Sequence, residues 1–170
     1  MLIKKKTGHK STEMIEADIR YGFSKIMSQS QPIYSITINN KLFKTTKELR
    51  FTLTNLFFNR IRKYYKFEDD ILNYFFVIEY PEVLSRGNFM IDDINVHCHI
   101  ILASRLSEET LKFYIEMIFD NKTICEKEWY KIEPIHDRED KNTFIDYLLK
   151  QVTLFTDDNY NYKINVTNSK

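Results

Sequence analysis

Two histidines, His97 and His99, stand one residue apart inside the apolar run "INVHCHIILAS" at residues 94–104. Successive side chains of a β-strand point to opposite faces, so both imidazoles would project from one face while Cys98 points to the other. Imidazole is a common ligand for divalent metals such as zinc and nickel. The pair therefore predicts a metal site on one face of a sheet. The alternative is that both histidines are ordinary hydrogen-bonded polar groups.

A carboxylate ligand is available one strand earlier, at Glu79 in "FFVIEYP". Residues 73–80 and 95–103 could pair as a hairpin. A one-residue shift in the register of this pairing moves every side chain to the other face of the sheet, so Glu79 lies on the histidine face in one of two alternative registers. A carboxylate in the ligand set would admit magnesium or manganese. Poorer candidates, nearer to the hairpin loop, are Glu82, Asp92 and Asp93. The alternative for Glu79 is a solvent-facing position.

A third reactive group is the phenol of Tyr147 in "FIDYLLKQ" at residues 144–151. Helical spacing puts Lys150 one turn further along on the same side. A tyrosine can be a covalent nucleophile, and a neighbouring ammonium group can stabilise phosphate charge or a developing phenolate. The alternative is a packing role, which is the usual role of a helical tyrosine.

These side chains must be positioned by a small number of predicted elements. Strands are predicted where β-branched and aromatic residues concentrate, and helices where apolar residues recur every three or four positions. The predicted strands are residues 32–40, 71–82, 95–104, 128–135 and a short last strand at 161–166. The predicted helices are residues 45–65, 107–120 and 140–155. Residues 1–30 are weakly patterned, with a short helix within 11–29 as the only element indicated.

This order of elements favours an α+β fold. We expect a central antiparallel sheet with helices on one face, and the other face open for a ligand. At 170 residues the chain is expected to form a single domain, residues 1–170, with its core at about 32–155.

Composition excludes several classes of protein. The net charge of +1 gives no global field that favours or disfavours nucleic acid. Three glycines, at positions 8, 22 and 87, cannot form a P-loop or a dinucleotide-binding fingerprint. The two cysteines do not make a disulfide framework. Without a long apolar run or a signal-peptide pattern, we expect no membrane association and a cytoplasmic location, in a bacterial or host cell.

One predicted helix mixes basic and aromatic residues, in "RFTLTNLFFNRIRKYYK" at residues 50–66. Such a mixture suits phosphate contacts and base stacking. The candidate DNA-binding residues are Arg50, Arg60, Arg62, Lys63 and Lys66. The alternative is that the cations complement the helix dipole and the aromatic rings pack in the core.

Taken together, "VHCHIIL" and, about fifty residues later, "YLLK" resemble the motifs of the HUH endonucleases. The likeness is greatest to the single-tyrosine initiators of rolling-circle replication in small plasmids, phages and viruses. The apolar-hydroxyl strand "YSITIN" (34–39) is similar to their first motif. "WYKIEPIHDREDKNTFIDYLLKQ" (129–151) resembles their strand and catalytic helix. The likeness spans about residues 32–155.

The resemblance implies a fold with a ferredoxin/RRM-like palm, in which the histidine strand is central and single-stranded DNA crosses the open face. It implies that His97, His99 and Glu79 hold a divalent ion, magnesium or manganese. It also implies that Tyr147 attacks a phosphate of the replication origin, single-stranded or hairpin, to leave a 5′-phosphotyrosine and a free 3′ end. Lys150 would orient the phosphate or stabilise the phenolate. The implied partners include a host or plasmid helicase and a polymerase.

Two other functions remain open on the sequence. Gln151 makes the tyrosine motif fit Tyr-x-x-x-Gln as well, which resembles the single-tyrosine transposases of small insertion sequences. The other alternative is a non-catalytic nucleic-acid-binding module with the same sheet. The sequence does not determine whether Gln151 or His136 takes part in the site.

Overall fold

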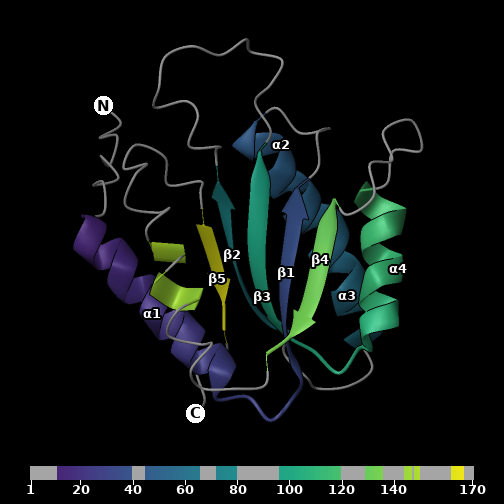
Figure 1. Ribbon diagram of the computed structural model, residues 1–170, viewed down its shortest axis with the longest axis horizontal. Coiled ribbons are helices and arrows are strands. Elements are labelled where there is room, and N and C mark those ends of the chain that lie inside the picture. The colour runs from purple at the N-terminus through teal and green to yellow at the C-terminus, as the bar shows by residue number, and fades with distance from the viewer. Residues whose placement is uncertain are drawn as a thin grey trace, which may run out of the picture.

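The computed structural model describes residues 11–39, 45–65, 72–79, 96–119, 129–135, 144–146, 148–149 and 162–166. Its described strands form one sheet in which every pairing is antiparallel, in the order β4-β1-β3-β2-β5 (Figure 1). The strands are β1 (Ile33–Asn39), β2 (Asn73–Glu79), β3 (His97–Ala103), β4 (Tyr130–Pro134) and β5 (Tyr162–Asn165). The predicted antiparallel α+β fold and the central position of the histidine strand are confirmed.

Helices flank this sheet. They are α1 (Thr12–Met27), α2 (Thr46–Phe51), the π-helical segment η1 (Thr52–Phe57), α3 (Phe58–Tyr65) and α4 (Glu108–Phe119). Residues 144–146 and 148–149 are also helical. In Figure 1, α2 and α3 lie behind the sheet, α4 lies beside β4 and α1 lies on the β5 side. No helix in the described part of the chain is both long and apolar enough to cross a bilayer.

The predicted helix at residues 45–65 is observed as the continuous run α2–η1–α3. It begins at Thr45, whose side chain accepts a hydrogen bond from the amide of Glu48. Four of its buried residues recur every four positions, at Leu49, Leu53, Phe57 and Ile61. An α-helix has about 3.6 residues per turn, so a four-residue repeat drifts around the axis. The wider turns of η1 counter this drift and keep the apolar residues against the sheet.

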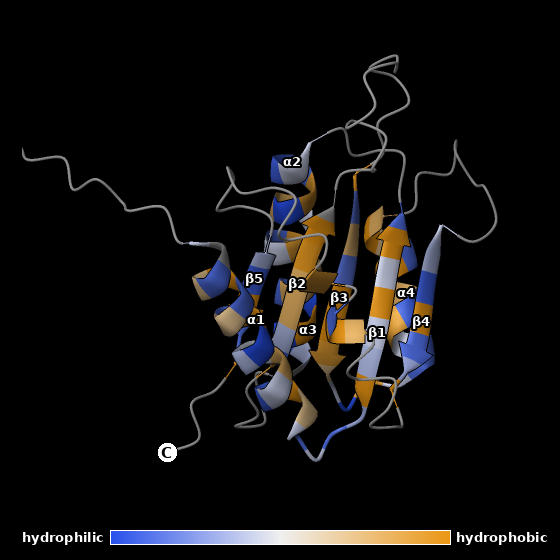
Figure 2. Cartoon of the chain, turned by 60° about the vertical axis from the view of Figure 1, so that its left-hand side comes forward, coloured by the Kyte–Doolittle hydropathy of each residue, from blue (hydrophilic) through white to orange (hydrophobic). Residues whose placement is uncertain are grey.

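Strand parity separates the two faces of the sheet. The even-numbered residues of β1, β2 and β3 pack against α2, η1, α3 and α4 in one large apolar cluster, and we name this side the helix-backed face. The odd-numbered residues form the second side, which we name the histidine face. Hydrophobic residues concentrate in these three central strands, whereas edge strand β4 is largely hydrophilic (Figure 2).

The histidine face is divided. One half is apolar and packs against α1 and the helical residues at 144–146 and 148–149; its strand residues are Ile33, Phe75, Val77, Ile101 and Ala103. The other half is polar. This corrects the predicted arrangement, which placed helices on one face only. α1 covers part of the second face because Ile15, Ile19 and Ile26 give it an apolar stripe that must be buried.

Helix α1 is longer than the short helix indicated within residues 11–29. Ser11 caps its N-terminus by accepting a hydrogen bond from the amide of Met14, and Glu13 and Lys25 complement the helix dipole at the two ends. The predicted turn at residues 85–94 and most of the predicted helix at 140–155 lie outside the described residues.

Candidate functional site

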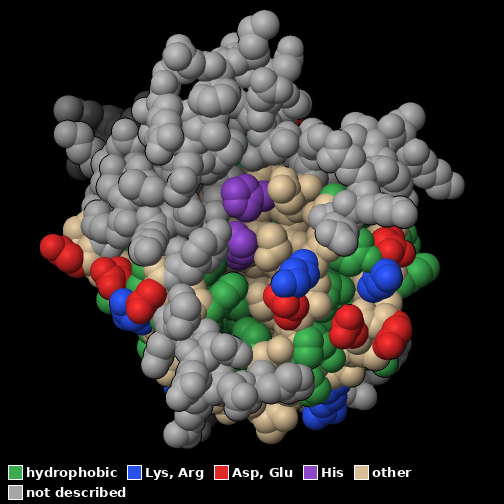
Figure 3. Space-filling model, in the orientation of Figure 1, with side chains coloured by type: hydrophobic (Ala, Val, Ile, Leu, Met, Phe, Trp, Pro, Cys, Tyr) green, Lys and Arg blue, Asp and Glu red, His purple; other side chains and the backbone are tan. Residues whose placement is uncertain are grey.

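The two histidines lie side by side on the polar half of the histidine face (Figure 3). His97 is half-buried and His99 is 7% exposed. Their ring centroids are 5.5 Å apart and the rings are nearly perpendicular, at 82°. Because β3 is the middle strand, it is held by hydrogen bonds on both sides. The imidazoles therefore stand on a rigid part of the fold, as a binding site requires.

Thr37 orients the second imidazole. It is the register partner of His99 on the neighbouring strand β1, and its Oγ1 lies 3.1 Å from Nδ1 of His99. Since Nδ1 is engaged by the hydroxyl, a metal would bind this ring through Nε2. A hydrogen bond to the other ring nitrogen commonly fixes the tautomer of a metal-binding histidine. Thr37 is not among the site residues predicted from the sequence, although a hydroxyl at an odd-numbered position of the apolar strand 34–39 indicates that it faces the histidines.

The strand register also determines on which face of the sheet residue 79 lies. Residue 79 is the direct partner of His97 in the pairing of β2 with β3, so its backbone position belongs to the histidine face. Its side chain lies outside the described residues. Among the residues that are described, no three His, Cys, Asp or Glu side chains are grouped so that they could hold a metal ion. The described part of the site therefore contains two neighbouring imidazoles, and the backbone of residue 79 is paired with that of His97.

The segment around the predicted nucleophile contacts His99. The ring of Phe144 packs edge-on against His99, with centroids 6.4 Å apart at 78°. Ile145, Leu148 and Leu149 are buried in the apolar half of the same face. Tyr147, Lys150, Gln151 and His136 lie outside the described residues. Two segments that are about fifty residues apart in the sequence are thus in contact on the histidine face of β3.

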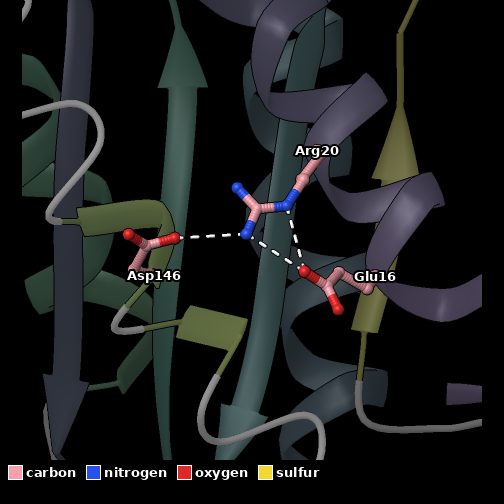
Figure 4. Close-up of polar contacts among 3 residues, drawn as sticks. All are labelled: Glu16, Arg20 and Asp146. Carbon is pink, nitrogen blue, oxygen red and sulfur yellow. Dashed lines mark hydrogen bonds and ion pairs between the residues drawn. The ribbon is translucent and has the colours of Figure 1, made fainter. Parts of the chain in front are cut away.

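A charged cluster joins this segment to α1. Arg20 donates from Nη2 to Asp146 Oδ1 at 3.2 Å, and from Nε and Nη2 to Glu16 Oε1 at 3.1 and 3.0 Å (Figure 4). The hydrogen bond to Glu16, and then the one to Asp146, raises the pKa of Arg20 above its usual value. Exposed ion pairs contribute little to stability. The cluster links the helical residues at 144–146 to α1 at the surface.

The predicted DNA-binding residues occupy a different part of the molecule. Arg50, Arg60, Arg62 and Lys63 belong to α2 and α3, which pack on the helix-backed face, and Lys66 lies outside the described residues. The structure therefore does not bring these cations to the histidines. The charged pair on the histidine face is Lys131 and Glu133 on β4, which are 2.6 Å apart and exposed. The predicted contact of α2 and α3 with DNA stays a prediction, separate from the histidine site.

Comparison with known proteins found no matching family model, no similar curated protein and no matching solved structure.

Proposed function

We propose that this chain is a metal-dependent endonuclease that nicks and rejoins single-stranded DNA through a covalent tyrosine intermediate. The observation that carries the proposal is the meeting of two distant segments. His99, which is paired with His97 on β3, is in contact with Phe144, and Phe144 precedes Tyr147 by three residues. A purely structural role of His99 would not require a neighbour from the segment that carries the tyrosine motif.

His97 and His99 are the proposed metal ligands, and Glu79 is the proposed third ligand. The fit depends on three features: both imidazoles share one face, Thr37 holds one ring through Nδ1, and residue 79 is in register with His97. This mixed nitrogen and oxygen set suits manganese or magnesium. When bound, the ion would polarise the scissile phosphate as a Lewis acid.

Tyr147 is the proposed nucleophile and Lys150 its assisting group. The phenol oxygen forms a bond to phosphorus while the bond from phosphorus to the 3′-oxygen breaks, and the phenol proton ends on the released 3′-hydroxyl. Lys150 stabilises the phenolate or the phosphate charge during this exchange. Because one phosphoester replaces another, the same residues catalyse the reverse attack by a 3′-hydroxyl. The biological role that we propose is initiation of rolling-circle replication, in the cytoplasm of a bacterial or host cell, with a helicase and a polymerase as partners.

The experiment is incubation of the protein with single-stranded oligonucleotides of varied sequence and manganese, followed by denaturing electrophoresis. We expect a covalent protein–DNA adduct, whose formation Tyr147→Phe abolishes. Tyr64→Phe, at an exposed position of α3, is the matched control and should react like the unaltered protein. An adduct that survives Tyr147→Phe would exclude the proposed nucleophile.

The two other functions give different results in the same experiment. A transposase of the same chemistry would form the adduct with oligonucleotides from insertion-sequence ends and not with replication origins. A non-catalytic binding module would retain the oligonucleotides and form no adduct with either class of DNA.

A further inference from the structure

Three cations line the outer strand β5 on the helix-backed side of the sheet. Arg50 on α2 donates from Nη1 to the carbonyl oxygen of Tyr162 at 3.2 Å. Arg62 on α3 donates from Nη2 to the hydroxyl of Tyr74 at 3.1 Å, and Tyr74 is the register partner of the last residue of β5, Asn165. Lys163 lies between these two anchor points. Residues 162 and 165 are three residues apart, which is roughly 10 Å along a strand, so the two arginines are anchored at separate points of the sheet edge, and we refer to the three cations as a row.

The arginines have an evident structural role, and Lys163 does not. Each arginine joins a helix to the sheet through a hydrogen bond, and Arg62 also lies over the ring of Tyr74, 5.7 Å from its centroid. No hydrogen bond or ion pair joins the ammonium group of Lys163 to another described residue. Attachment of the helices to the sheet therefore accounts for the two arginines at these positions. It does not account for Lys163.

The electrostatics of this row are unfavourable in the isolated protein. Burial lowers the pKa of Lys163 below its usual value, and the positive charges of Arg62 and Arg50 lower it further. Among the described residues, the charged groups that act on Lys163 are thus both cations. The same two arginines oppose the rise in the pKa of Tyr74 that burial causes. A group held against desolvation and like charge is typical of a binding site.

We propose that Arg50, Lys163 and Arg62 bind the phosphodiester backbone of a nucleic acid strand along the β5 edge. A bound anion would offset the repulsion within the row. The guanidinium fork matches phosphate oxygens, and the lysine adds a point charge between the two forks. A single small anion would contact fewer of these groups than consecutive phosphates of one strand, which can follow two anchor points roughly 10 Å apart along the strand.

This inference goes beyond the proposed function, because the row is on the side of the sheet opposite to His97 and His99. It needs neither metal nor Tyr147. If both proposals hold, the row retains DNA outside the reaction centre and helps to keep the nicked strand on the protein.

The test measures binding of a fluorescent oligothymidylate and of a duplex by anisotropy over a range of salt concentrations, in EDTA and in the Tyr147→Phe background. These conditions exclude cleavage and covalent capture, so failure of the nuclease proposal does not affect the result. We expect Lys163→Gln to reduce the slope of log K against log salt by about 0.7 for the single strand or 0.9 for the duplex. At about 0.1 M salt this corresponds to a roughly fivefold weaker affinity for the single strand.

Matched variants separate a specific contact from the loss of one charge. Lys112→Gln removes the same charge from the exposed surface of α4 and should leave both affinity and slope unchanged. Lys163→Arg keeps the charge and should retain binding. Equal effects of Lys163→Gln and Lys112→Gln would overturn the proposal. The proposal would also be overturned if inorganic phosphate displaced the oligonucleotide completely when the concentration of free phosphate equals that of the phosphate groups in the oligonucleotide. That result would mean that the site binds one small anion.

Discussion

The two faces of the sheet are built from alternate residues of the same strands, yet they are used differently. On the helix-backed face, Tyr74 and Phe76 stack with Phe58 and continue an apolar layer along the whole strand. On the histidine face, the apolar layer stops after about half of each strand and gives way to Thr37, His97 and His99. One face is used for packing along its full length, and the other for packing at one end only.

This difference indicates where polar side chains can be placed in the sheet with little loss of stability. The stabilisation gained by burying apolar surface is roughly proportional to its area. The helix-backed face and the apolar half of the histidine face together supply that burial for the central strands. The polar half can then hold two imidazoles in a sheet that is already rigid. We therefore expect stability and activity to depend on residues of opposite parity within one strand.

The largest effect is expected from a comparison within β3. Ile100, which is fully buried on the helix-backed face, should lose about 2–5 kcal/mol of unfolding free energy as Ile100→Ala. His97, which is half-buried on the other face, should lose less than about 1 kcal/mol as His97→Ala. Urea unfolding monitored by circular dichroism measures both values.

The stability gained on adding manganese should instead depend on His97 and not on Ile100. At a concentration about a hundredfold above its dissociation constant, a ligand that binds only the folded state adds roughly 2.7 kcal/mol of stability. We expect this gain in the unaltered protein and in a properly folded Ile100→Val, and none in His97→Ala. An equal gain in all three proteins would mean that manganese binds elsewhere, and the contrast between the faces would lose its functional meaning.

A smaller effect is expected at Thr37. Thr37→Val keeps the shape of the side chain and removes the hydroxyl that lies 3.1 Å from Nδ1 of His99. Loss of a hydrogen bond to a metal-binding histidine typically weakens metal affinity 10–100-fold. Titration calorimetry with manganese measures this directly. Ser35→Ala, two residues away on the same face of β1, is the control and should bind as the unaltered protein does.

The same comparison explains how much of the fold could be predicted from the sequence. Strand parity depends only on the alternation of side chains along the chain, so the shared face of His97 and His99 followed from their spacing. The helix at residues 45–65 followed from its cap and its apolar repeat, although its π-helical middle did not. The cover that α1 gives to the histidine face could not be predicted, because the stripe of a helix does not specify which surface it will bury.

The site was less predictable than the fold for a similar reason. The register of β2 against β3, which pairs residue 79 with His97, depends on hairpin geometry that the sequence leaves open between two parities. Lys163 lies in a segment that the sequence indicated only as a short last strand. Its place beside Arg50 and Arg62 comes from the position of β5 at the sheet edge. The basic residues of α2 and α3 were identified by composition, which cannot tell on which face of a sheet a helix packs.

The smallest effect is expected where α1 crosses β5, at the apolar end of the histidine face. A Cβ atom at Gly22 would lie 2.7 Å from Cγ2 of Ile164, a branched methyl group that has little freedom to move. Overpacking typically costs 1–3 kcal/mol, while alanine gains about 1 kcal/mol over glycine in a helix. We therefore expect Gly22→Ala to lose about 1 kcal/mol of unfolding free energy. Ser24→Ala, at an exposed position of α1, should instead gain a few tenths. If both variants gain stability, α1 is not in close contact with the sheet edge, and the division of the histidine face into a packed half and a polar half would have to be abandoned.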